Sequence, residues 1–141
     1  MQAAEVSRRL EDARDSGNFI AKAQALTEEL EHDPDGFAAI YPILRFIEAN
    51  PHLDFGTPGP LVHFVERFYG RGYEAKLMES IGRCPTLSTV WMLNRVLNGT
   101  RHPGERARLR SVLSGVAESP TTDPQPRQLA RHFLDRDAGR G

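Results

Sequence analysis

A chain of 141 residues is long enough to bury a hydrophobic core without disulfides or a structural metal. Its hydrophobic fraction of 39% and charged fraction of 26% are typical of a folded domain, and its single cysteine excludes an internal disulfide framework. The net charge of −1 argues against a dedicated nucleic-acid-binding domain, which we expect to be basic.

Charge is distributed unevenly along the chain. Met1 to Pro60 holds 11 acidic and 5 basic residues, whereas Leu61 to Gly141 holds 8 acidic and 13 basic ones. Such an asymmetry can steer an oppositely charged protein toward one end. No apolar stretch approaches the roughly 20 residues of a membrane span, and Met1–Gly17 contains no apolar run like that of a signal peptide. We therefore expect a cytoplasmic protein with no membrane partner.

The periodicity is helical along almost the whole chain, and no strand alternation is evident. The first helix is predicted from Ala3 to Asp15 and the second from Phe19 to His32. Between them, the turn formers of residues 16–18 close the first helix.

The third predicted helix begins after Asp35 and contains a proline, Pro42. A proline in a helix removes one backbone hydrogen bond, so we expect a kink or a restart there. The apolar stripe continues across the proline, which indicates a largely buried helix. The stripe consists of Phe37, Ile40, Tyr41, Leu44 and Ile47.

Five further helices are predicted after Pro60. Gly70 is a candidate left-handed cap, and Asp123 precedes the last helix. Residues 1–2 and 137–141 have nothing to bury and are expected to be frayed. The five helices are predicted at Leu61–Tyr69, Glu74–Ile81, Thr86–Asn98, Gly104–Glu118 and from Pro124 onward.

These elements predict an all-α fold of about eight short helices in antiparallel pairs, forming a single domain over residues 1–141. Pairs that start near Asp35 and Gly72 are about 37 residues apart, close to the period of helical solenoid repeats. A HEAT-like solenoid is therefore favoured, and a compact irregular bundle is the alternative.

No pattern of catalytic residues stands out. His52, Asp54 and His63 could form a metal site, since imidazole and carboxylate are suitable ligands, but no recognised metal motif accompanies them. Cys84 follows Arg83, which could lower its thiol pKa, yet a small buried hydrophobic role is the favoured interpretation. We expect no enzyme activity, no metal and no cofactor.

Two polar helix faces and one loop are better candidates, for binding a partner protein. Tryptophan, tyrosine and arginine are enriched at the residues that dominate binding energy. For His63, Glu66 and Arg67, the alternative is a solvated helix face with an internal ion pair. For Trp91, the alternative is a position in the core. The candidates are His63, Glu66, Arg67 and Tyr69; Trp91, Asn94, Arg95 and Asn98; and Asp54 and Thr57 of the proline-containing loop.

Three segments carry a resemblance to a known group of proteins. They read YPILRFIE from Tyr41, DFGTPGPLVHFVE from Asp54 and PTLSTVWMLNRVLN from Pro85. Over Phe37 to Gly99 the chain resembles the small helical bacterial immunity proteins of polymorphic-toxin and contact-dependent growth inhibition systems. The resemblance implies a cytoplasmic, non-catalytic inhibitor that forms a heterodimer with a cognate toxin domain. It assigns no binding residues, because immunity families do not share one binding site.

Three functions therefore remain open at this point. The favoured one is a toxin-neutralising immunity protein that blocks its partner with a preformed, charge-complementary surface. The second is a helical scaffold or regulatory module that binds another cellular protein. The third is a metal-dependent hydrolase built on the two histidines and the aspartate named above.

Overall fold

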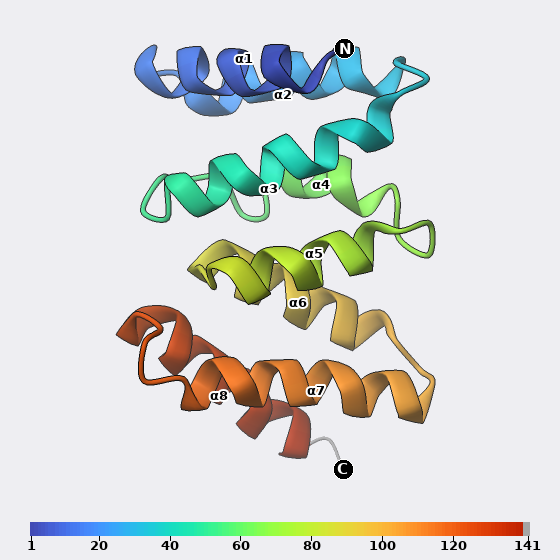
Figure 1. The fold of residues 1–141 in the computed structure, drawn as a ribbon, viewed down its shortest axis with the longest axis vertical. Coiled ribbons are helices and arrows are strands. Elements are labelled where there is room, and N and C mark those ends of the chain that lie inside the picture. Colours follow the sequence, from blue (N-terminus) through green and yellow to red (C-terminus); the bar gives the residue numbers. More distant parts are fainter. Residues whose placement is uncertain (140–141) are drawn as a thin grey trace. The chain divides into compact units, whose positions relative to one another are not determined.

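A computed structural model describes residues 1–139 and confirms the all-α prediction, with eight α-helices, one short 3₁₀ helix and no strand among those residues (Figure 1). None of the helices described is long and apolar enough to span a membrane. The helices are α1 (Ala3–Asp15), α2 (Phe19–Glu31), η1 (Gly36–Ala39), α3 (Ile40–Ala49), α4 (Pro60–Glu66), α5 (Tyr73–Arg83), α6 (Leu87–Gly99), α7 (Pro103–Glu118) and α8 (Pro124–Gly139).

The chain divides into two compact units, Met1–Lys76 and Leu77–Gly141, and α5 begins in the first and ends in the second. In the first unit α1 packs on α2 and α3, and α2 packs on α4. In the second unit α6, α7 and α8 pack on one another.

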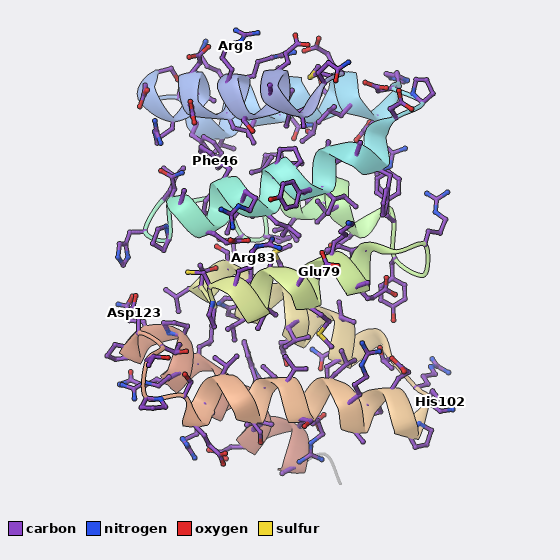
Figure 2. The ribbon with its side chains drawn as sticks, in the orientation of Figure 1. Arg8, Phe46, Glu79, Arg83, His102 and Asp123 are labelled. Carbon is purple, nitrogen blue, oxygen red and sulfur yellow. The ribbon has the colours of Figure 1, made fainter. Side chains whose placement is uncertain are left out.

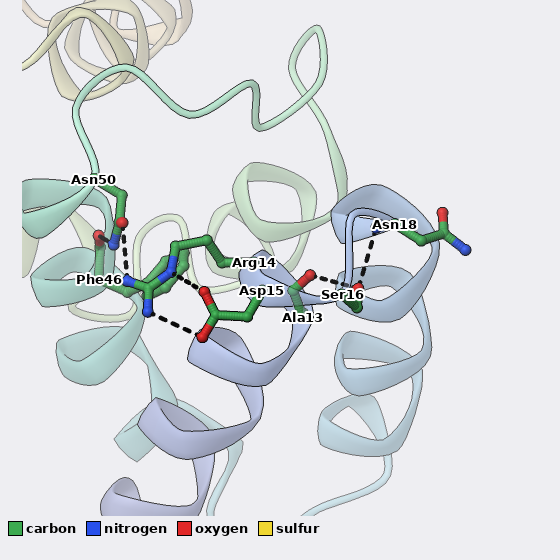
Figure 3. Close-up of polar contacts among 7 residues, drawn as sticks. All are labelled: Ala13, Arg14, Asp15, Ser16, Asn18, Phe46 and Asn50. Carbon is green, nitrogen blue, oxygen red and sulfur yellow. Dashed lines mark hydrogen bonds and ion pairs between the residues drawn. The ribbon is translucent and has the colours of Figure 1, made fainter.

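A bridge from Arg14 shows how α1 and α3 are aligned (Figure 3). The guanidinium binds Asp15 and also donates to Oδ1 of Asn50 at 3.1 Å, while Asn50 donates to the carbonyl oxygen of Phe46 at 2.9 Å. The bridge joins the carboxyl end of α1 to that of α3, so the two helices run in the same direction. The hydrogen bond from Arg14 also lowers the pKa of Asp15 from its ordinary value.

An ion pair shows that α2 and α4 also run in the same direction. Arg67, just after α4, lies 3.6 Å from Glu31 at the end of α2, measured from Nη1 to Oε1. First helix on first helix and second helix on second helix is the stacking pattern of helical repeats. Within the first unit, the helices that stack on one another in this way therefore run in parallel.

The third predicted helix is a 3₁₀ turn followed by a restarted α-helix. Because α3 begins at Ile40, Pro42 lies in its first turn. Backbone N–H groups in the first turn have no acceptor within the helix, so the missing N–H of proline costs no hydrogen bond there. The restart alternative is thus confirmed. The expected apolar stripe was wrong at Phe37 and Tyr41, whose side chains are 37% and 50% exposed.

The core of the first unit includes an aromatic cluster as well as aliphatic side chains. Phe19 stacks on Phe46 with ring centroids 5.7 Å apart, and Phe55 meets both rings edge-on. Because Phe55 lies in the loop between α3 and α4, this cluster holds the loop against the first turn of α2. Dispersion and ring geometry add to the burial energy at such contacts.

A buried carboxylate joins three helices of the second unit. Asp137 on α8 has a side chain only 4% exposed and pairs with Arg106 and Arg110 of α7. Arg106 also donates to the carbonyl oxygens of Leu97 and Thr100, at 2.8 and 2.9 Å. One guanidinium thereby satisfies the last carbonyls of α6 and binds α8 at the same time.

This network corrects the expectation of a frayed tail at residues 137–139. They continue α8, and Asp137 is buried because two arginines compensate its charge. Residues 140–141, also expected to be frayed, lie outside the described residues.

Asp137→Asn is expected to lower the free energy of unfolding of the second unit by about 1–3 kcal/mol, because two arginines lose a charged acceptor. Trp91, the only tryptophan, lies in this unit, so its fluorescence can follow urea unfolding. The matched control is Asp135→Asn, two residues earlier on the exposed side of α8. Equal urea midpoints for the two variants would contradict a structural role for Asp137.

Candidate functional site

The outer face of α6 carries four of the predicted binding residues. The side of α6 that faces the core is formed by apolar residues, and the opposite side by Trp91, Asn94, Arg95 and Asn98, which we call the Trp91 face. Spacings of three, four and seven residues place all four on one side of a helix. The buried apolar residues of α6 are Val90, Met92, Leu93, Val96 and Leu97.

Trp91 is not a core residue. Its side chain is 52% exposed, the largest fraction among the exposed large hydrophobic residues of the described chain. The indole is nevertheless held in place, since it meets the ring of Phe133 edge-on with centroids 4.9 Å apart. Phe133 on α8 is itself 2% exposed. The tryptophan is therefore positioned by the core and is still exposed.

Two residues of α8 lie on the same side as this contact, and the sequence analysis did not select them. Arg131 of α8 reaches the carbonyl oxygen of Ala117 on α7, which marks the side of α8 that faces α7. His132 and Arg136 lie on the other side, and both are exposed. The His132 ring also contacts Phe133, with centroids 5.8 Å apart. Only the long-range contact between α6 and α8 could have indicated these residues.

The predicted set on α4 lies in the first unit. His63 and Arg67 are exposed, Glu66 is half-buried, and Tyr69 is 45% exposed just beyond the helix. The alternative interpretation of this set was an ion pair within the helix itself. The ion pair observed for Arg67 instead joins it to Glu31 of α2. Arg67 is therefore partly committed to holding α4 against α2.

A second exposed aromatic group adjoins Tyr69 in the sequence and was not predicted. Phe37 is 37% exposed and meets Phe68 edge-on at 5.5 Å, and the guanidinium of Arg71 lies 5.2 Å from the Phe68 ring centroid. Gly72, at φ +108°, allows the turn, because a Cβ there would lie 3.0 Å from the Phe37 ring. A cation beside an aromatic face gains a modest electrostatic attraction.

The loop before α4 has a backbone that two glycines permit. Asp54 is exposed and accepts a hydrogen bond from the Gly56 N–H at 2.9 Å, and Thr57 is exposed at the tip. Gly56 and Gly59 have φ values of +98° and +93°. A Cβ on Gly59 would lie 1.7 Å from the carbonyl oxygen of Phe55, so only glycine fits.

The residues considered for metal binding do not form a metal site. Among residues 1–139, no three histidine, cysteine, aspartate or glutamate side chains lie close enough together to hold a metal ion. His52, Asp54 and His63 are all exposed. The hydrolase alternative therefore has no geometry to support it.

Cys84 differs from the prediction, which placed it in the core. Its thiol is free and exposed, because the break at Pro85 leaves it at the end of α5. It borders a cleft of about 540 Å³ formed by the ends of α5 and α7 and by the loop before α8. The residues that line the cleft include Ile81, Val116 and Asp123.

No family model, curated protein or solved structure matches this chain. Its candidate site therefore has to be judged from its own residues.

Figure 2 shows the side chains along the helices, including Arg83 and Asp123, which line the cleft, and Phe46 of the aromatic cluster.

Trp91→Ala is expected to cost about 1 kcal/mol of stability or less, because half of its side chain already contacts water. Phe133→Ala removes a buried ring and should cost about 3–5 kcal/mol. Thermal unfolding followed by circular dichroism compares the two variants. A loss for Trp91→Ala as large as that for Phe133→Ala would show that the indole acts as a core residue.

Gly59→Ala is expected to destabilise the first unit by more than Gly70→Ala. Both glycines have positive φ, but a Cβ on Gly70 has no atom within 4 Å, so it costs only the left-handed conformation, about 1–2 kcal/mol. Gly59→Ala adds the clash with the Phe55 carbonyl. Circular dichroism in a urea titration measures both variants, and equal losses would contradict the clash.

Proposed function

We propose that this chain is a cytoplasmic protein that binds and blocks a cognate bacterial toxin domain, as the resemblance to immunity proteins implies. Trp91 is the observation that favours a binding function. A tryptophan that is 52% exposed, fixed edge-on against a buried phenylalanine and flanked by Arg95 is a preorganised anchor. Such anchors dominate interface energies, and preorganisation reduces the entropy lost on binding.

The second candidate is a helical scaffold or regulatory module that binds a different cellular protein. The same face supports it, because an exposed aromatic anchor does not specify the partner. The two candidates differ in the phenotype that they predict in cells. Only the first predicts that the chain restores growth to cells that express a toxin domain.

The test begins with the gene directly upstream of this chain: if it encodes a large secreted protein, the C-terminal domain of that protein is the candidate toxin. Expression of that domain alone should arrest growth, and co-expression of this chain should restore it. Arrest that persists with the folded chain present would reject the immunity function. The absence of a toxin domain at that position would favour the scaffold.

Trp91→Ala is expected to weaken binding to the purified toxin domain by about thirtyfold, since truncating an anchor typically costs about 2 kcal/mol or more. Arg95→Ala and Arg67→Ala should weaken it as well, and Arg67→Ala should also lower stability by about 1 kcal/mol or less, because it loses the exposed pair with Glu31. Arg8→Ala is the control, since Arg8 is exposed on α1 outside the predicted sets. Arginine variants that fold normally and bind as tightly as the parent chain would show that these surfaces are not used.

A further inference from the structure

The cleft that Cys84 borders lies within the second unit, and part of its lining is apolar. Its volume of about 540 Å³ is within the range of about 300–1,000 Å³ that is usual for small-molecule sites. Among the residues that line it, Ile81 and Val116 are each 4% exposed, and Met78 and Val112 are half-buried. These four side chains offer apolar surface against which an aliphatic chain can be buried.

Most of the polar residues of the cleft carry oxygen atoms. Ser119, Thr121 and Thr122, which have hydroxyl groups, line it together with Asp123. Asp123 (Figure 2) is exposed, and no side chain among residues 1–139 forms an ion pair with it. Its carboxylate is therefore available to a cation.

The helix ends around the cleft also favour a cation over an anion. The carboxyl ends of α5 and α7 both border it. Aligned peptide dipoles place partial negative charge at such ends. The amino end of α8 has few donors for an anion, because Pro124 and Pro126 have no N–H and that of Arg127 bonds to a backbone carbonyl oxygen.

The basic character of the second unit does not extend to the cleft lining. Residues 77–141 contain ten arginines, no lysine and six acidic residues, a net charge of +4, whereas residues 1–76 have a net charge of −5. Of the described residues that line the cleft, Arg83 is the only basic one, and it already has an interaction of its own. Arg127, one turn after Asp123, is half-buried and does not line the cleft. The carboxylate of Asp123 is therefore the charged group of the lining that is left for a ligand.

We propose that this cleft binds a short alkylammonium ion. The aliphatic chain lies against Ile81, Val112 and Val116, and the ammonium group pairs with the carboxylate of Asp123. A free amine is favoured over a lysine side chain of a partner protein, because the cleft has the volume of a small-molecule site. The cleft shares no residue with the Trp91 face, so this binding is independent of the proposed function.

Titration of the isotope-labelled full chain with hexylamine, followed by nuclear magnetic resonance, tests the proposal at about pH 7, where the amine is protonated. The amide resonances of Gly82 and Gly115, which line the cleft, are expected to shift saturably, with half-saturation at about 1 mM for so small a ligand. The resonance of Gly70 in the first unit should not move. Hexanoate, which has the opposite charge, should bind at least about tenfold more weakly.

Asp123→Asn should weaken hexylammonium binding by about tenfold, because the ammonium group loses its charged acceptor, and should leave the binding of hexanol unchanged. Asparagine is as favourable as aspartate before a helix, so the variant should fold, as circular dichroism verifies. Asp135→Asn is the matched control, since Asp135 is exposed on α8 and does not line the cleft. Equal affinities of the two variants for hexylammonium would overturn the proposal.

Gly115→Leu tests the place of binding, because its side chain occupies the cleft. A Cβ on Gly115 has no atom within 4 Å, so the substitution fits the fold. Hexylammonium binding, followed at the Gly82 resonance, should be lost. Gly139→Leu, at an equally open position outside the cleft, should bind as the parent chain does. Unchanged binding by Gly115→Leu would reject this site.

Three further outcomes would also overturn the proposal. Two of them are the absence of a saturable shift at Gly82 and Gly115 and hexanoate binding as tight as that of hexylammonium. The third concerns N-acetyl-lysine methylamide, whose aliphatic chain is shorter and which should bind about tenfold more weakly, since fewer methylene groups are buried. Binding of this compound as tight as that of hexylammonium would reject a free amine in favour of a lysine side chain.

Discussion

The contact between Arg106 and Asp137 is the interaction on which the candidate surface of the second unit depends. A charge buried as deeply as that of Asp137 is tolerated only where hydrogen bonds and opposite charge compensate its desolvation. Arg106 provides both, and its remaining N–H groups bind the last carbonyls of α6. Because the same guanidinium contacts α6 and α8, it fixes the position of one helix along the other.

The alignment of α6 with α8 determines how firmly the indole of Trp91 is held in place. An exposed tryptophan on an isolated helix samples several rotamers, and ordering it on binding costs entropy. Here Phe133 lies beneath the indole edge, and Asp137, one turn later on α8, keeps Phe133 in register with α6. The exposed ring is thus supported by a buried ring, which is in turn held by a buried ion pair. The position of the exposed ring therefore depends on contacts that are buried beneath it.

The sequence contained most of the information on the helices and on the side of α6 that faces outward. The spacing of Val90, Leu93 and Val96 defines a buried side, and the helical period places Trp91 opposite that side. Its apolar neighbour Met92 made the core alternative plausible, but Met92 widens the buried side from its other edge. Helix periodicity was therefore a better guide to Trp91 than the general tendency of large aromatic residues to be buried.

Features that depend on distant residues could not be predicted in the same way. Asp137 looked like part of a polar tail because its partners, Arg106 and Arg110, lie about 30 positions earlier and no local pattern links them. Likewise, Phe37 and Tyr41 fit an apolar stripe, but the change from 3₁₀ to α geometry at Ile40 alters the period.

The separation of charge gives the two units net charges of opposite sign. With net charges of −5 and +4, each unit attracts a different kind of surface, although the whole chain is nearly neutral. A nearly neutral molecule with a local basic field can steer an acidic surface without a large nonspecific attraction to polyanions. Specificity must then come from the fixed geometry around Trp91, because exposed charges alone are screened by salt within about 10 Å at 0.1 M ionic strength. The buried network of Asp137 provides that geometry.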